Sequence, residues 1–207
     1  YSEAYWESRV MAPSSLLFYL GFDRRLEGLR HHNLFFDRSL DVHAREIYDA
    51  PAWPSDPLMY VCVPSITDPS VAPAGHENVF ALIPIAPGLE DTPAIRERYL
   101  RQVLDRIGQR TGIDVRPHMV LQRSYCINDF QADHNAFRGN AYGLANTLRQ
   151  TAVLKPRMKS RRVQGLYFTG QLTVPGPGVP PSLISGQVVA DLIAKEFPQR
   201  ATSPLPA

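Results

Sequence analysis

The sequence predicts an α/β protein of the α+β type, in which a mixed or antiparallel sheet is followed by a strand–loop–helix element. Several β-prone runs precede one long amphipathic helix pattern, and more irregular chain follows. The chain then closes on an apolar run, a Pro/Gly-rich loop and a second periodic helix pattern. These observations divide the chain into expected units at 1–144 and 145–197, with a disordered tail at 198–207.

Short apolar runs bounded by turn residues predict the strands, at 14–20, 29–36, 58–63, 79–85, 115–125 and 166–170. Near-continuous apolarity at 58–63 and 79–85 predicts that both faces of these two strands are covered. Within a strand over 29–36, His31 and His32 would point to opposite faces. Neither histidine has partners at metal-ligand spacing, so both are interpreted as ordinary strand residues.

Helical spacing of apolar residues predicts helices at 40–48, 93–111 and 183–197, with a short helix or turn at 127–135. The long helix has the clearest ends. Thr92 is a typical N-cap, Pro93 suits the first turn, and Gly112 is expected to end the helix. Its buried stripe is predicted to be Ile95, Tyr99, Leu100, Val103, Leu104 and Ile107.

Composition narrows the class of protein. The chain has 207 residues, 44% of them hydrophobic and 20% charged, with a net charge of +2, so no bulk attraction to nucleic acid is expected. Cys62 and Cys126 form no CxxC pair, which predicts no disulfide framework, no zinc site and a cytoplasmic location. No apolar run is long enough for a membrane span, and the opening residues resemble mid-protein sequence, so we expect a fragment.

The stretch TVPGPGVPPSLISG, residues 173–186, is the most informative segment. Its prolines stiffen the connection, and its glycines let a flat ligand approach the backbone closely. The helix is expected to begin at Pro180, Pro181 and Ser182, and Ser182 either caps it or lies in its first turn. A helix N-terminus offers free N–H groups and a partial positive charge to an anionic or polarisable ligand. A stiff connection that serves only the fold explains the segment equally well.

The GPG of this loop does not extend into a dinucleotide-binding fingerprint. A GxGxxG motif would place glycine where Pro181 stands, and it would be followed by an acidic residue about 20 positions further along a βαβ unit. Taken alone, the loop is therefore no nucleotide motif.

Residues 166–193, LYFTGQLTVPGPGVPPSLISGQVVADLI, resemble the C-terminal signature of phytoene desaturases and related carotenoid dehydrogenases and isomerases, within the flavin-containing amine-oxidase-like superfamily. The stretches 135–157 and 63–89 are similar to the regions that precede this signature. The resemblance implies that 1–144 is part of a substrate-binding domain and that 145–197 completes an FAD-binding domain. It also implies that the N-terminal dinucleotide-binding half is absent.

The same resemblance implies a set of FAD-binding residues. Gly170 and Gln171 would lie near the pyrophosphate or ribityl chain. The helix start would face the flavin N1–C2=O edge, with Gly178, Val179, Pro180, Pro181 and Ser182 around it. Many relatives have an acidic residue where this chain has Gln171, so no carboxylate contact is expected there. The catalytic residues stay unknown, and this chain alone is expected to be inactive and to bind no FAD tightly.

The implied reaction is flavin-dependent desaturation of phytoene or a related hydrophobic polyene. A carotenoid isomerase or retinol-saturase-like flavoprotein is the alternative within the family, and a non-catalytic binding module is the alternative outside it. Peripheral membrane contact is expected because such substrates reside in lipid, and the basic run 149–162 would favour anionic lipids, although a solvated loop explains it as well. Apolar surface that the missing segments would cover is expected to favour homo-oligomers.

Few residues qualify as a catalytic base. Asp129 and His134 are weak candidates, since Asn128 or Asp129 more simply caps a short helix. Cys62 and Cys126 are interpreted as small core residues. Aromatic residues of the first half either line a hydrophobic tunnel or belong to the core: Phe18, Tyr19, Phe22, Phe35 and Phe36.

Overall fold

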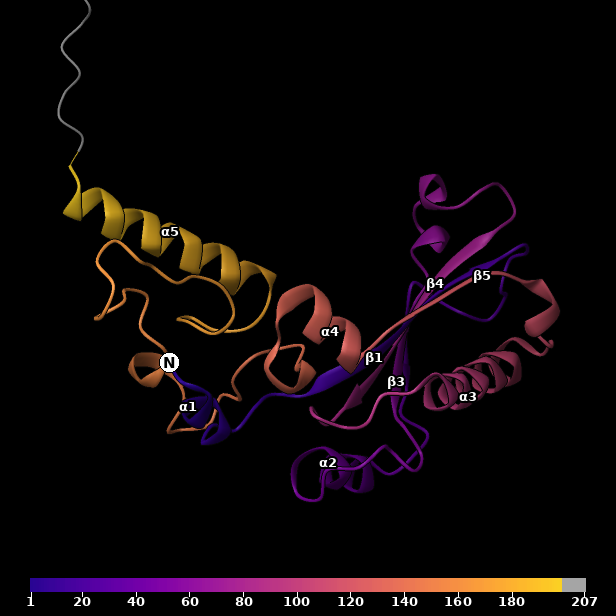
Figure 1. Cartoon of the computed structure of the whole chain (residues 1–207). Coiled ribbons are helices and arrows are strands. Elements are labelled where there is room, and N and C mark those ends of the chain that lie inside the picture. The colour runs from indigo at the N-terminus through magenta and orange to yellow at the C-terminus, as the bar shows by residue number, and fades with distance from the viewer. Residues whose placement is uncertain (199–207) are drawn as a thin grey trace, which may run out of the picture. The chain divides into compact units, whose positions relative to one another are not determined.

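The computed structural model describes residues 1–198 and divides them into two compact units (Figure 1). Residues 13–141 form the sheet unit, and residues 1–12 together with 142–198 form the C-terminal unit. The sequence grouped residues 1–12 with the sheet, whereas the structure groups them with the end of the chain. The reason is pairing across the sequence, because Met11 bridges Leu144. Of the predicted tail, 199–207 lies outside the described residues.

The sheet unit contains five strands in the order β2-β3-β4-β1-β5, and every neighbouring pair is antiparallel. The strands are β1 Ser14–Phe22, β2 His32–Phe35, β3 Met59–Cys62, β4 Glu77–Ile85 and β5 Met119–Tyr125. The antiparallel form of the predicted sheet is thus confirmed. β5 starts later than expected because Arg116–His118 form a 3-10 turn that includes Pro117, which has no N–H for a ladder.

Helix α3, Pro93–Thr111, packs its apolar stripe against one face of the sheet (Figure 1). Its ends follow the prediction, since the Thr92 hydroxyl accepts a hydrogen bond from Ile95 N at 3.3 Å and Gly112 adopts φ 73°. Arg106 is also buried on this helix, where its guanidinium pairs with Asp37 and the carbonyl of Pro57. The other helices are α1 Glu3–Glu7, α2 Leu40–Tyr48, α4 Ile127–His134 and α5 Val179–Glu196.

The second face of the sheet is only partly covered. Along β3 and β4, fully buried residues alternate with half-buried ones. The prediction that both faces of these strands are covered is therefore wrong. All but one of the half-buried positions are apolar or aromatic, the exception being Asn78, so their sequence does not show the polar alternation that usually marks an open face.

In the C-terminal unit, the predicted strand at 166–170 is wrong. Tyr167 forms one isolated bridge to Lys159, and the residues around it pair with no strand in the described part of the chain. A strand requires a ladder of partners, and apolar composition alone does not supply one. Short 3-10 turns complete the described structure at Pro64–Ile66, Pro69–Val71, Arg116–His118, Phe137–Gly139 and Ala152–Leu154.

Candidate functional site

The N-terminus of α5 lies at the end of the Pro/Gly loop. The helix begins at Val179, four residues before the periodic pattern at Leu183 and one residue before the expected start at Pro180, and Gly178 is its N-cap with φ 110°. Ser182 lies in the first turn, where its N–H donates to the Gly178 carbonyl at 3.0 Å. Ser182 is therefore not the cap.

The tip of α5 offers fewer hydrogen-bond donors than expected. Pro180 and Pro181 occupy its second and third positions and have no N–H, so Val179 alone supplies an N–H among the first three helical residues. The expectation of several free amides at this end is wrong. The helix dipole remains, because it arises from all the aligned peptide units.

A buried hydroxyl joins this helix to the chain at Gly170. Ser185 is fully buried, and its Oγ donates to the Ser182 carbonyl at 2.6 Å. It accepts the Gly170 N–H at 2.7 Å and lies 2.7 Å from the Thr169 hydroxyl. Ser185 thus brings two predicted FAD-binding segments together. Sequence reasoning missed it, and its only signal is a small polar residue within the apolar turns of LISG.

Open space lies beside Gly170. This glycine has φ 102°, and a Cβ placed on it would meet no atom within 4 Å. Its carbonyl accepts bonds from the Thr173 N–H at 3.1 Å and the Thr173 hydroxyl at 2.9 Å, which fixes the turn. Gln171 is half-buried and close to Gly143. The backbone at Gly170 is accessible to a ligand in this unit.

Lys155 is the residue of this region that the sequence misassigned. It was counted in the surface basic run, but it is only 5% exposed and its Nζ has no hydrogen-bond partner. Its Cε and Nζ would lie 3.3 and 3.5 Å from a Cβ at Gly176, so the ammonium is next to the Pro/Gly loop. Burial lowers the pKa of Lys155 below its usual value. A cavity of about 490 Å³ adjoins it, lined also by Pro156, Val174 and Leu192.

These features would suit an anionic or polarisable group, such as the flavin edge that the sequence resemblance implies. A buried cation without a counter-charge is costly, and an anionic group would offset that cost. The dipole of α5 acts in the same direction. Lys155 therefore supplies positive charge beside Gly176 of the Pro/Gly loop.

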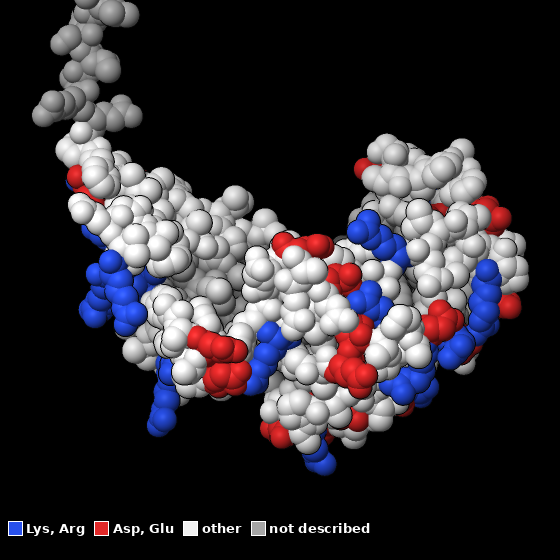
Figure 2. All heavy atoms as spheres, in the orientation of Figure 1, with Lys and Arg blue, Asp and Glu red and all other residues white. Residues whose placement is uncertain are grey.

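Four of the other five basic residues of the run line a second pocket. Arg157, Lys159, Arg161 and Arg162 line a cavity of about 400 Å³ together with Tyr1 and other N-terminal residues. Figure 2 shows Lys and Arg side chains gathered on the C-terminal unit beside α5. Lys159 is neutralised by Glu196, 2.5 Å away. The arginines leave a net positive charge in this pocket.

The candidate base Asp129 is engaged in structure. Its carboxylate accepts the Cys126 N–H at 2.8 Å, which confirms the interpretation as a helix cap, and it lies 2.7 Å from Arg96. Arg96 also binds Asp91 through two nitrogens at 2.6 and 2.7 Å. Burial alone would raise the pKa of Asp91, but the Arg96 guanidinium and the Asn128 amide outweigh burial and hold the pKa below its usual range.

The candidate base His134 ends α4 and lies against the rings of Tyr125 and Phe130. Asn128 does not cap α4. Its side chain donates instead to the Asp91 carbonyl at 3.0 Å. Neither observation gives His134 a catalytic partner, and its proposed role as a base stays a prediction.

The aromatic residues divide between the core and the open face. Phe18 and Phe22 are fully buried, Phe35 packs on the core from its edge, and Phe36 and Tyr19 are exposed. The open face is the partly covered face of the sheet, opposite the face that α3 covers. On it, ring contacts run from Tyr19 to Phe80, from Phe80 to Tyr60 and from Tyr60 to His32, at centroid distances of 5.4, 6.3 and 6.0 Å. We call these four rings the aromatic row.

A cavity of about 440 Å³ adjoins one end of the aromatic row. Its lining is mainly apolar and includes Tyr19, Gly21, Val71, Phe80, Val120 and Leu121.

The two adjacent histidines do not diverge as predicted. β2 begins only at His32, so strand alternation does not apply to His31, and the two imidazole centroids are 4.2 Å apart. Cys62 is half-buried next to them on the open face, and is not the core residue expected. Cys126 is buried, as predicted.

Known proteins provide an independent comparison. The chain is 48% identical over 197 residues to a carotenoid 3,4-desaturase of Haloarcula japonica, covering 95% of this chain and 40% of that protein. It is 32% identical over 202 residues to an all-trans-zeta-carotene desaturase of Myxococcus xanthus, covering 94% and 37%. It is 30% identical over 193 residues to a 4,4'-diaponeurosporene oxygenase of Staphylococcus aureus, covering 91% and 39%.

The chain spans about 40% of the length of these relatives. No family model matches it. Among residues 1–198, no helix has the length and apolarity that a membrane crossing requires. The identities, sustained over more than nine-tenths of the chain, nevertheless agree with the resemblance of residues 63–89, 135–157 and 166–193. The chain belongs to the phytoene desaturase and carotenoid dehydrogenase family.

Proposed function

We propose that this chain contributes to an FAD-dependent carotenoid desaturase, with the α5 end as part of the flavin site and the open face of the sheet as part of the polyene site. The observation that carries the proposal is the unpartnered Lys155 ammonium beside the Pro/Gly loop, in a chain that is 48% identical to a carotenoid 3,4-desaturase. Exposed apolar residues on α5, among them Leu183 and Ile184, support packing within a larger flavin domain.

A bound flavin would take two electrons and one hydrogen from the substrate, which forms a carbon–carbon double bond as the neighbouring carbon loses a proton. Residues of this chain would hold and polarise that group. Gly170 and Gly178 keep the backbone free of side chains, and Ser185 fixes their spacing. The α5 dipole and Lys155 would stabilise negative charge that develops at the nearby flavin edge.

The open face would supply the apolar environment for the polyene. Conjugated chains are flat and apolar, and they stack favourably against aromatic rings. Tyr19, Phe80 and Tyr60 offer such rings in a row, next to the apolar cavity. A site of this kind aligns the substrate and excludes water, and it needs few polar groups.

We also propose contact with a lipid surface through the basic pocket of the C-terminal unit. Arg157, Arg161 and Arg162 would attract anionic headgroups, and the exposed side chains of Val153 and Leu154 could enter the interface. Sedimentation with vesicles tests this contact. Binding should require anionic lipid and should weaken when Arg161 and Arg162 are both changed to Glu, whereas equal binding to neutral vesicles would contradict it.

The flavin role is tested with the complete protein that contains this chain. Lys155→Met should weaken FAD binding and lower the flavin midpoint potential by tens of millivolts, since about 30 mV equals 1.4 kcal/mol for a two-electron couple. Lys195→Met is the matched control, because Lys195 is exposed on α5 and lines neither of the cavities described for this unit. Equal affinities and potentials in the Lys155 variant and the control would contradict the assignment.

Product analysis separates the reactions found or expected in the family. Cells that make phytoene, or an acyclic carotenoid, would express the complete gene. The 48% identity to a 3,4-desaturase favours the carotenoid, with loss of two hydrogens per double bond. A product of unchanged mass would indicate isomerisation, and gain of oxygen would indicate an activity like that named for the Staphylococcus relative.

A further inference from the structure

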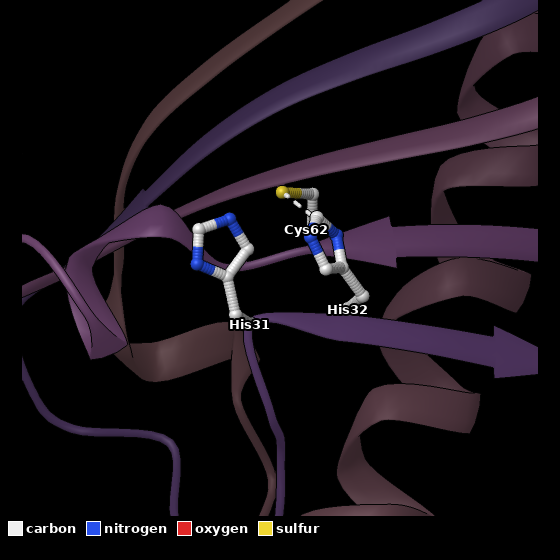
Figure 3. A group of neighbouring side chains, drawn as sticks. All are labelled: His31, His32 and Cys62. Carbon is white, nitrogen blue, oxygen red and sulfur yellow. Dashed lines mark hydrogen bonds between the residues drawn. The ribbon is translucent and has the colours of Figure 1, made fainter.

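Three side chains with strong metal-ligand chemistry meet on the open face of the sheet. His32 in β2 lies opposite Cys62 in β3 in the antiparallel register, and His31 immediately precedes β2. One ligand atom from each of the three residues lies within 4.8 Å of the other two. Figure 3 shows the thiol and both imidazole rings around a shared space.

Local backbone structure gathers these residues. The His31 carbonyl accepts the Val63 N–H at 2.8 Å, which holds the start of β2 against the end of β3. Because His31 lies just outside the strand, its ring can lie on the same side as that of His32, 4.2 Å away. Sequence spacing alone cannot show this cluster, since the cysteine is 30 residues from the histidine it faces.

Neighbouring hydroxyls orient both imidazoles. His31 Nδ1 lies 2.6 Å from Thr67 Oγ1, and His32 Nδ1 lies 2.7 Å from Tyr60 Oη. Histidines that bind metals usually have such an outer partner, which fixes the ring. Cys62 Sγ lies 3.9 Å from His32 Nδ1.

The spacing suits a tetrahedral ion after small side-chain rotations. Zinc bonds of about 2.3 Å to sulfur and about 2.0 Å to nitrogen put neighbouring ligand atoms roughly 3.5 Å apart. In this structure the ligand atoms lie within 4.8 Å of one another, so they are up to about 1.3 Å too far apart for such an ion. Rotation of one side chain about a χ angle can close a gap of this size. Two imidazoles and a thiolate form a donor set that prefers Zn²⁺ or Cu⁺ over hard cations such as Mg²⁺.

We propose that His31, His32 and Cys62 bind a thiophilic cation, Zn²⁺ in the first instance, with a fourth coordination position open to solvent. His32 is exposed and the other two residues are half-buried, so an ion can enter directly. Binding converts the Cys62 thiol to a thiolate and releases its proton. The inference does not depend on the proposed flavin chemistry.

The first test uses Co²⁺ as a spectroscopic probe with the purified full chain. Wild-type protein should bind one Co²⁺ with a thiolate-to-cobalt charge-transfer absorption, and Zn²⁺ should displace it. Cys62→Ser should abolish that absorption, and His31→Gln or His32→Gln should weaken binding by at least tenfold. His76→Gln is the matched control, because His76 bonds only within its own turn and should leave binding unchanged. An unchanged absorption in Cys62→Ser would overturn the proposal.

The second test needs no variant. Zn²⁺ should slow alkylation of Cys62 by iodoacetamide at least tenfold, read by peptide mass spectrometry, while buried Cys126 stays unreacted as an internal reference. A Cys62 alkylation rate that Zn²⁺ does not change would overturn the proposal even if a variant failed to fold.

Discussion

The sheet unit and the C-terminal unit differ in how much apolar surface they bury and in whether their buried charges have a counter-charge. All 21 residues of the buried hydrophobic cluster belong to the sheet unit. Among the described residues of the C-terminal unit, the buried hydrophobic side chains are Ala12, Leu144, Met158 and Val189. The exposed apolar residues of α5 reach 75% exposure at Val179 and 71% at Leu183.

Charged groups show the same difference. In the sheet unit, buried Asp91 is bound by Arg96 and by the Asn128 amide. In the C-terminal unit, buried Lys155 has no hydrogen-bond partner. A buried charge that is paired within its own unit contributes to the stability of that unit. A buried cation without a partner is costly, and an anionic ligand that pairs with it would offset that cost. This contrast agrees with the proposed flavin site.

The largest expected effect is a loss of stability of the sheet unit. Arg96→Met would leave the carboxylates of Asp91 and Asp129 close together without their cation, and the free energy of unfolding of this unit should fall by about 3 to 5 kcal/mol. Urea denaturation measures the change. Arg101→Met on the same helix is the matched control, because Arg101 pairs only with exposed Glu97 at 3.9 Å. Similar losses of unfolding free energy in both variants would show that the cluster of Arg96 with Asp91 and Asp129 does not stabilise the unit more than an exposed ion pair does.

The next effect concerns the C-terminal unit. Ser185→Ala removes the hydroxyl that accepts the Gly170 N–H, and it should cost about 1 to 3 kcal/mol because that amide loses its partner. Hydrogen exchange of the Gly170 amide should become faster. Ser182→Ala is the control, since only the carbonyl and N–H of Ser182 take part in the described network. The proposal would be contradicted if Ser182→Ala were the more damaging change.

A smaller effect is expected when acid protonates Asp91 in the sheet unit. The pKa of Asp91 is lower in the folded state than the unfolded value of about 3.9, so its contribution is complete above about pH 4 and is lost as the pH falls through the folded pKa. The difference in unfolding free energy between wild type and Asp91→Asn should therefore shrink on acidification. Urea midpoints across this range measure it, and a difference independent of pH would contradict the assignment.

The smallest expected effect is at a helix end. Thr92→Ala removes the N-cap hydroxyl of α3 and should cost about 1 kcal/mol in the stability of the sheet unit. Thermal unfolding should show a lower Tm for Thr92→Ala, and Thr92→Ser, which keeps the hydroxyl, should restore it. No recovery with serine would indicate that the threonine methyl group matters more than the cap.

Local patterns in the sequence correctly predicted most of the sheet unit. The ends of α3 depend on Thr92, Pro93 and Gly112, whose preferences act within one turn of chain. The strands of the sheet follow from apolar runs in the same way, although β5 starts four residues late. The loop and helix at 173–196 were also found, because proline and glycine restrict the backbone wherever they stand.

Only the tertiary structure decided which distant groups meet. It put Lys155 under the Pro/Gly loop, joined Ser185 to Gly170, engaged Asp129 with Arg96, and turned His31 and His32 toward Cys62. It also left 166–170 without a strand partner in the described chain. Backbone preferences are local and can be read from neighbouring residues, whereas the burial of a charge and the meeting of ligands depend on how remote segments pack.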